Sequence, residues 1–209
     1  YCMGGNLALG LAARRPGEVG PLALLATPWD FHAGHGLARA ALSAMQPSLE
    51  RMITAQGTLR VDALQALFNG LNPGLANSKF RNLSNVRANS RKFANFVALE
   101  DWLNDGVPLA GPVARECLFD WYGKNTPGRG VWAISGTFVD PTKLDQPALV
   151  IVPKDDYIVP PSSALPLVDA LPNATLRTVK AGHIGMIAGG QSATLLHRPL
   201  ADWIAGQLI

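Results

Sequence analysis

Three side chains, Cys2, Asp156 and His183, have the residue types that covalent acyl chemistry requires. A cysteine nucleophile needs a base that takes its proton, and the base needs a partner that orients it. Cys2 lies in the sequence Tyr-Cys-Met-Gly-Gly of residues 1–5, which opens directly into an apolar helical run over residues 6–13. A reactive side chain between a strand and a helix, ringed by small residues, is typical of a nucleophile elbow. We therefore predict that Cys2 is the nucleophile.

The two glycines of this stretch, Gly4 and Gly5, fit the same interpretation. A side chain at either position is expected to collide with the strand beside the turn. The sequence starts one residue before Cys2, so the strand that should lead into the elbow is not visible. We therefore expect the chain to be truncated at its N-terminus.

The candidate acid and base each follow a predicted strand in the last third of the chain. Asp156 follows the aliphatic run 148–152, and His183 follows the predicted strand 175–179. Loops at the carboxyl ends of parallel strands carry the functional residues of open α/β sheets. The order Cys, Asp, His is the nucleophile–acid–histidine order of α/β-hydrolases. Asp155 is the rival acid, but Asp156 directly precedes a hydrophobic segment that would fix its loop.

The remaining candidate residues favour structural roles. His32 and His35 have H-x-x-H spacing, but a metal site needs further ligands, and Cys2 lies on another element, so we expect no metal. His197 is expected at the surface of the last helix, and Cys117 is expected to be packed among aromatic residues. No phosphate-binding glycine loop or dinucleotide fingerprint follows a strand, so we expect no bound cofactor.

Hydrophobic periodicity divides the chain into three segments. Residues 1–28 read as elbow, helix and strand, residues 29–130 as a helical block, and residues 131–209 as α/β structure again. The fold class predicted is therefore α/β, an α/β-hydrolase core interrupted by a helical cap over residues 29–130. Long insertions in such scaffolds usually serve function.

Individual elements follow from the same patterns. The predicted strands are 22–26, 148–152 and 175–179, and residues 131–139 are predicted to be extended with a turn at Gly136. The predicted helices are 3–14, 37–56 with a break at Pro47, 61–69, 90–104, one opened by Gly111-Pro112, 165–171 and 192–208.

Composition excludes several classes of protein. Apolar residues make up 48% of the 209 residues and charged residues 16%, as in a packed globular protein. No apolar run approaches the roughly 18 residues that a membrane-spanning helix requires. Two cysteines do not form a disulfide framework, which favours a reducing, cytoplasmic location. The net charge of +3 is spread along the chain, so nucleic-acid binding is not expected.

Several motifs together resemble a known family, the polyhydroxyalkanoate synthases, and in particular the short class III enzymes that work with a partner subunit. The motifs lie at residues 1–5, 96–122, 136–147, 154–161 and 182–186, and the resemblance covers almost the whole chain. Members of this family are similar to α/β-hydrolases, but they transfer hydroxyacyl groups from coenzyme A to a growing polyester.

The resemblance implies a role for each candidate residue. Cys2 would carry the acyl group, His183 would activate Cys2, and Asp156 would assist His183 or the incoming hydroxyl. The backbone N–H of Met3 would be the first oxyanion donor, and an upstream loop would supply the second. It also implies a 3-hydroxyacyl-coenzyme A substrate, contact with a polyester granule surface, and a homodimer or a partner subunit.

Two alternatives remain open from the sequence. The same triad can hydrolyse its substrate, as in a thioesterase, a depolymerase or an enzyme like dienelactone hydrolase. A degenerate homologue could instead act as a granule-associated scaffold. The presence of Cys2, Asp156 and His183 favours an enzyme, whereas Tyr157, where the family commonly has His, favours the scaffold slightly.

Overall fold

The computed structural model describes residues 1–34, 36–71, 79–81 and 83–207. The chain forms two compact units, which are described separately. Unit 1 consists of Tyr1–Gly36 and Asp120–Ile209, and unit 2 consists of Leu37–Phe119. The inserted unit is therefore shorter at both ends than the cap that the sequence predicts.

A three-stranded parallel sheet forms the centre of unit 1. Its strands are β1 (Leu22–Leu25), β6 (Ala148–Pro153) and β7 (Ala174–Val179), in the order β1-β6-β7. Every residue of β6 is buried, as expected for the central strand of a parallel sheet that is covered on both faces. The predicted strands 22–26, 148–152 and 175–179 are therefore confirmed, and each end differs from the observed one by no more than one residue.

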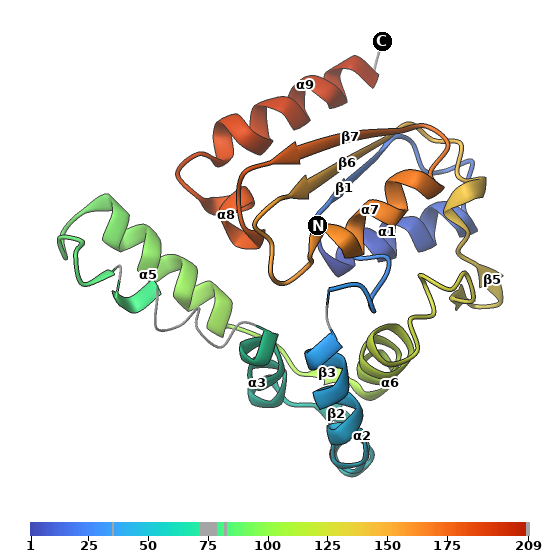
Figure 1. Ribbon diagram of the computed structural model, residues 1–209, viewed down its shortest axis with the longest axis horizontal. Helices are drawn as coiled ribbons and strands as arrows, with labels where there is room; N and C mark the ends of the chain where they lie inside the picture. Colours follow the sequence, from blue (N-terminus) through green and yellow to red (C-terminus); the bar gives the residue numbers. More distant parts are fainter. Residues whose placement is uncertain (35, 72–78, 82, 208–209) are drawn as a thin grey trace. The chain divides into compact units, whose positions relative to one another are not determined.

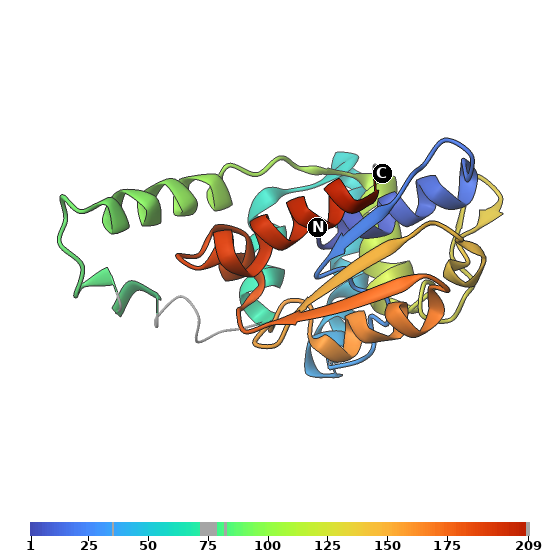
Figure 2. The ribbon, with the colours of Figure 1, turned by 90° about the horizontal axis from the view of Figure 1, so that it is seen from above.

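Helices cover both faces of this sheet (Figures 1 and 2). Helices α1 (Met3–Arg14) and α7 (Pro161–Ala170) lie on one face, and α8 (His183–Ala188) and α9 (Arg198–Gln207) lie on the other. Alternate strand residues serve the two layers, because successive side chains of a strand point to opposite faces. Leu149 and Ile151 pack with Met186 of α8 in one buried cluster. The predicted α/β architecture is confirmed.

Two helices of unit 1 differ from their predicted ranges. Helix α7 begins at Pro161, earlier than the predicted start at residue 165, because proline is well suited to the first turn of a helix. The predicted closing helix 192–208 is divided into a π-helical turn, η3 (Ala193–His197), and α9. Residue 208 lies outside the described residues.

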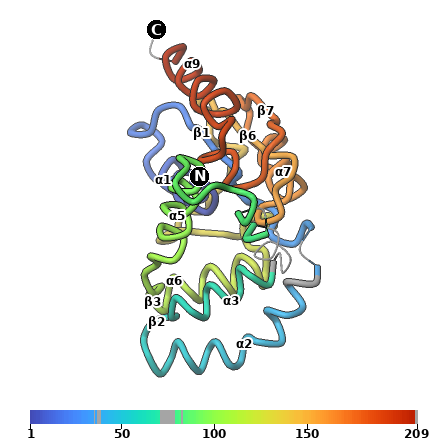
Figure 3. Tube along the Cα trace, turned by 90° about the vertical axis from the view of Figure 1, so that its left-hand side faces the viewer, coloured from blue at the N-terminus to red at the C-terminus, as the bar shows by residue number. Residues whose placement is uncertain are grey.

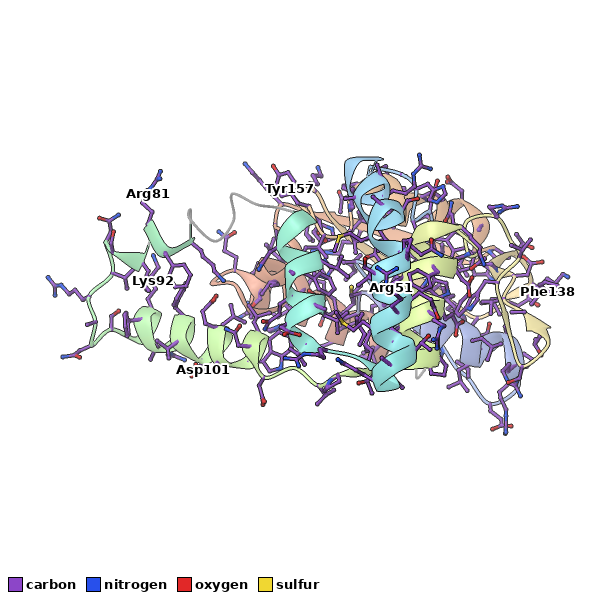
Figure 4. The ribbon with its side chains drawn as sticks, turned by 90° about the horizontal axis from the view of Figure 1, so that it is seen from below. Arg51, Arg81, Lys92, Asp101, Phe138 and Tyr157 are labelled. Atoms are coloured by element: carbon purple, nitrogen blue, oxygen red, sulfur yellow. The ribbon has the colours of Figure 1, made fainter. Side chains whose placement is uncertain are left out.

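The predicted turn at Gly136 is confirmed as a tight hairpin. Strands β4 (Ala133–Ile134) and β5 (Thr137–Phe138) pair antiparallel, and the 3-10 turn η2 (Pro141–Lys143) follows. Both turn residues, Ser135 (φ 47°) and Gly136 (φ 82°), adopt the left-handed conformation that two-residue hairpins favour. The hairpin anchors α1, because Nη1 of Arg14 donates to the carbonyl of Ile134 at 2.9 Å. Phe138 projects from it into solvent (Figure 4).

An aromatic cluster holds the two segments of unit 1 that flank the insertion. Phe31 lies 5.6 Å from Trp121 between ring centroids, and Trp121 lies 5.0 Å from Trp132. Trp29 also contacts Trp132, at 6.3 Å. All four rings are at least 95% buried. These contacts explain why residues 29–36 and 120–130, predicted as parts of the cap, belong to unit 1.

A polar network reinforces the same junction. The Oδ1 atom of Asp30 accepts from Nδ2 of Asn125 at 2.8 Å and from the N–H of His32 at 2.9 Å. The Oδ1 atom of Asn125 in turn accepts from the N–H of Phe31 at 2.9 Å. Asn125 is buried and has a φ of 54°, a conformation that asparagine tolerates better than most residues. The network therefore fixes the segment that leaves the sheet after β1.

Unit 2 is mostly helical, as predicted. It contains α2 (Gly36–Gln56), α3 (Val61–Leu71), α5 (Arg91–Asn104) and α6 (Gly111–Arg115), and the π-helical segment η1 (Glu116–Gly123) returns the chain to unit 1. Its two-stranded sheet, β2 (Thr58–Leu59) with β3 (Leu109–Ala110), was not predicted and lies at the end of α2 (Figure 3). A strand of two residues is too short to show the alternation of apolar and polar residues by which strands are predicted from sequence.

Two helices of unit 2 test the sequence predictions further. The predicted break at Pro47 is wrong, because α2 continues through it while Leu42, Leu49 and Ile53 bury one face. The predicted helix 90–104 is confirmed as α5, and Ser90 caps its N-terminus, since Oγ of Ser90 accepts from the N–H of Phe93 at 3.2 Å. Lys92 and Asp101 project from α5 (Figure 4). Within the described ranges, every helix is too short or too polar to cross a bilayer.

Candidate active site

Cys2 occupies a strained turn at the start of α1. Its φ of 53° and ψ of −138° lie outside the regions that L-residues normally adopt. The N–H of Cys2 donates to the carbonyl of Leu25 at 2.8 Å, which ties the turn to the end of β1. Strain of this kind concentrates at functional sites, and a nucleophile elbow requires it. The backbone geometry thus agrees with the predicted elbow.

Close packing beneath the elbow explains one of its two glycines. A Cβ atom on Gly5 would overlap the side chain of Thr27, which is fully buried just beyond β1. A Cβ atom on Gly4 would meet no described atom within 4 Å. The expected collision with a neighbouring segment is therefore found at Gly5 but not at Gly4.

Asp156 is held rigidly in the loop after β6. Its Oδ1 atom accepts from the N–H groups of Ile158 at 2.9 Å and Val159 at 2.8 Å, and its Oδ2 atom faces Nδ1 of His183 at 2.7 Å. The side chain is fully buried, whereas its rival Asp155 is exposed. Of the two aspartates, only Asp156 is placed to orient a histidine.

His183 lies between the carboxylate and the thiol. It is the first residue of α8 and its side chain is only 7% exposed. Burial by itself lowers the pKa of His183, but the hydrogen bonds to Asp156 and Cys2, with the charges of both groups, raise it to about 9. The imidazole therefore favours its protonated form near neutral pH, with the Asp156 side chain at its Nδ1 atom.

Tyr1 adds an aromatic ring to the same group. Its ring centroid lies 4.7 Å from that of His183, with 32° between the ring planes. Burial, and then the charges of Cys2 and Asp156, raise the pKa of the Tyr1 hydroxyl strongly. The phenol is therefore neutral over the whole physiological range.

The backbone N–H of Met3 is the first of α1. The N–H groups of Gly4 and Gly5 donate to the carbonyls of Tyr1 and Cys2, at 3.0 Å and 2.9 Å. Among the backbone hydrogen bonds that the described ranges form outside regular helices and strands, none has the Met3 N–H as donor. An N–H in the first turn of a helix has no partner within the helix and is available to an anionic ligand.

The other described residues singled out by sequence have contacts of their own. The ring of His32 contacts the carbonyl of Gly123 at 3.0 Å, and that of His197, on the surface, contacts the carbonyl of Ile187. Cys117 is half-buried, and burial followed by the charge of Glu116 raises the pKa of its thiol to about 11. His35 lies outside the described residues, and the rest hold no cluster of three metal-ligating side chains.

The raised pKa of His183 predicts a dependence of stability on pH. The pKa of His183 in the folded protein, about 9, exceeds its ordinary value of 6.5. The interaction of protonated His183 with its partners therefore stabilises the fold fully below pH 6.5, and this contribution is lost as pH rises through 9. The difference corresponds to at most about 3 kcal/mol. We expect the unchanged protein to have a higher free energy of urea unfolding than His183→Gln at pH 6, and the two values to become similar at pH 10. An equal gap at both pH values would contradict the ion pair.

Comparison with known proteins places this geometry in a family. The profile of the alpha/beta hydrolase fold matches residues 1–189. The chain belongs to the alpha/beta hydrolase fold family. Solved hydrolases of this fold agree: the monoacylglycerol lipase of Paleococcus ferrophilus superposes with a TM-score of 0.59 at 17% identity, covering 99% of this chain and 66% of the lipase. A thermophilic esterase from Thermogutta terrifontis gives 0.54 at 16% identity, over 99% and 63%.

Curated relatives of the chain share the name PhaC. The chain is 30% identical to the poly(3-hydroxyalkanoate) polymerase subunit PhaC of Synechocystis sp., over 98% of this chain and 56% of the relative. It is 29% identical to PhaC of Haloferax mediterranei, over 98% and 42%, and 27% identical to PhaC of Allochromatium vinosum, over 97% and 58%. The chain spans about half the length of these relatives. The predicted resemblance to polyhydroxyalkanoate synthases is confirmed.

Two features of this alpha/beta hydrolase site were missed in the sequence. The N–H groups that hold Asp156 come from two and three residues further along, a turn pattern that aspartate commonly forms and that could have distinguished it from Asp155. The contact between the rings of Tyr1 and His183 joins residues that are far apart in the sequence, and no local pattern predicts it. Tyr157 itself is 68% exposed and projects outward (Figure 4).

Proposed function

We propose that the protein transfers 3-hydroxyacyl groups from coenzyme A thioesters to the hydroxyl end of a growing polyester. This proposal rests on the contacts of His183 with Asp156 and Cys2, in a chain of which 98% aligns with a polymerase subunit. The three groups have the types, order and contacts of a nucleophile, a base and an orienting acid.

The first half of the reaction loads the cysteine. The reaction starts from the neutral form of His183, which takes the proton of Cys2 as Sγ attacks the thioester carbonyl of the hydroxyacyl-coenzyme A. The bond from the carbonyl carbon to the coenzyme A sulfur then breaks, and the departing thiolate takes the proton from His183. The N–H of Met3 stabilises the oxyanion that forms in between. One thioester replaces another, so the acyl group stays activated.

The second half extends the polymer. The hydroxyl of another hydroxyacyl unit gives its proton to His183, its oxygen attacks the acyl group on Cys2, and the bond to Sγ breaks as Cys2 regains a proton. Asp156 holds the imidazole and stabilises its charge in both halves. The thiol, imidazole and carboxylate suffice for this chemistry, so we propose that coenzyme A enters as part of the substrate and that no resident cofactor is needed.

The setting of the reaction is part of the same proposal. A polyester product is insoluble, so the enzyme would work at the surface of a polymer granule in the cytoplasm. The similarity to proteins named as polymerase subunits suggests a second copy or a different subunit as its partner. We propose that the inserted unit 2, like other long insertions, serves substrate or partner binding.

An assay with 3-hydroxybutyryl-coenzyme A separates transfer from hydrolysis. Free thiol is followed with a chromogenic disulfide, and the products are analysed as polymer or free acid. We expect thiol release with polymer as the main product, because the acyl group on Cys2 is kept for a hydroxyl acceptor. Free acid as the sole product would contradict transfer and support a hydrolase. The absence of thiol release would contradict both enzymatic interpretations.

A further inference from the structure

The aromatic ring of Tyr1 lies against the imidazole of His183. The centroids are 4.7 Å apart and the planes are inclined by 32°, so the imidazole sits over the face of the phenol ring. Tyr1 directly precedes Cys2, so the elbow that presents the thiol also presents this ring. The imidazole is thus contacted by Asp156 at Nδ1 and by Tyr1 on its face.

Because His183 favours its charged form, the contact with Tyr1 adds a cation–π attraction to van der Waals packing. A cation within about 6 Å of an aromatic centroid is attracted by the negative face of the ring, and the attraction grows when water is excluded. His183 is buried, and its neighbours favour the imidazolium. The Tyr1 hydroxyl stays neutral because its pKa is raised, so the ring acts through its π face rather than as a phenolate.

We propose that Tyr1 is a positioning residue that holds the His183 ring and stabilises its protonated form. The proposal deepens the proposed acyl transfer and rests on it for the role of His183. In each half of that reaction His183 gains a positive charge and must keep one ring orientation between acid and thiol. A stacked aromatic ring supplies both conditions, and it leaves the edge of the imidazole free to exchange protons.

The groups that face His183 limit what else can set its pKa. Asp156 approaches from the loop after β6, and Cys2 and Tyr1 approach from the elbow. Lys154 and Asp155, on the same loop as Asp156, have exposed side chains and are screened by solvent. A change at Tyr1 therefore acts on His183 with the other two close partners retained.

The test measures the pKa of His183 by NMR titration of the protein labelled at histidine, with the His183 signal assigned by its loss in His183→Gln. In Tyr1→Leu, which keeps an apolar side chain but removes the π face, we expect the pKa to fall by about 0.5–1 unit. In Tyr1→Phe, which keeps the ring and loses the hydroxyl, we expect the value of the unchanged protein. An equal fall in the pKa of His183 in both variants would assign the effect to the hydroxyl and contradict the proposal. An unchanged pKa in Tyr1→Leu would also overturn it.

A second pair of replacements covers the case in which Tyr1→Leu does not fold. Phenylalanine and pentafluorophenylalanine at position 1 have nearly the same shape, but fluorination removes the negative potential of the ring face. We expect the fluorinated ring to lower the pKa of His183 relative to phenylalanine, and equal values would overturn the proposal. Neither titration requires a substrate. A protein without acyl transfer activity can therefore still show the Tyr1 effect, and an active protein can still lack it.

Discussion

Replacing Asp156 with asparagine should lower the rate of thiol release from 3-hydroxybutyryl-coenzyme A by about 10³–10⁴-fold. Asparagine can keep the hydrogen bonds from Ile158 and Val159 through its carbonyl oxygen, because both N–H groups reach Oδ1. Its amide nitrogen then faces Nδ1 of His183 and donates to it. The histidine must carry its proton on Nε2, where it can no longer accept the proton of Cys2.

The neighbouring aspartate supplies the matched control. Asp155 is exposed and has the same chemistry one residue earlier, so Asp155→Asn should leave the rate within about twofold of the unchanged protein, as for most surface substitutions. Circular dichroism and thermal unfolding would show that both variants are folded. A fall of less than about tenfold in Asp156→Asn, or an equal fall in both variants, would contradict the assignment of the acid.

Much of the core fold is readable from the sequence because the signals are local. The run 148–152 is aliphatic throughout, which marks a strand covered on both faces, and β6 is buried along its whole length. Gly136 marks a turn because its φ of 82° suits glycine, and the hairpin forms there. Strand order places Asp156 and His183 at adjacent strand ends, so their proximity follows from the pattern of strands.

The parts that sequence reasoning missed depend on contacts between distant segments. The limits of the inserted unit depend on Phe31 meeting Trp121 and on Asp30 meeting Asn125, and these pairs are far apart in the chain. Helix α2 continues through Pro47 because buried residues on both sides of the proline stabilise the helix. This tertiary packing outweighs the low helix propensity of proline. The stacking of Tyr1 on His183 belongs to the same class.

The second large effect concerns the thiol itself. Cys2→Ala removes the nucleophile, so we expect thiol release from the substrate to fall by at least about 10³-fold. Cys117→Ala is the matched control, because that thiol is half-buried in unit 2 and its pKa is raised to about 11. A protonated thiol is a poor nucleophile, so this variant should react like the unchanged protein.

The most direct measurement is the site of acylation. The protein is mixed with 3-hydroxybutyryl-coenzyme A, quenched in acid within the first turnover, digested, and analysed by mass spectrometry. We predict a 3-hydroxybutyryl thioester on the peptide that contains Cys2, retained in Cys117→Ala and absent in Cys2→Ala. An acyl group on any other residue, or one that persists in Cys2→Ala, would contradict catalysis through Cys2.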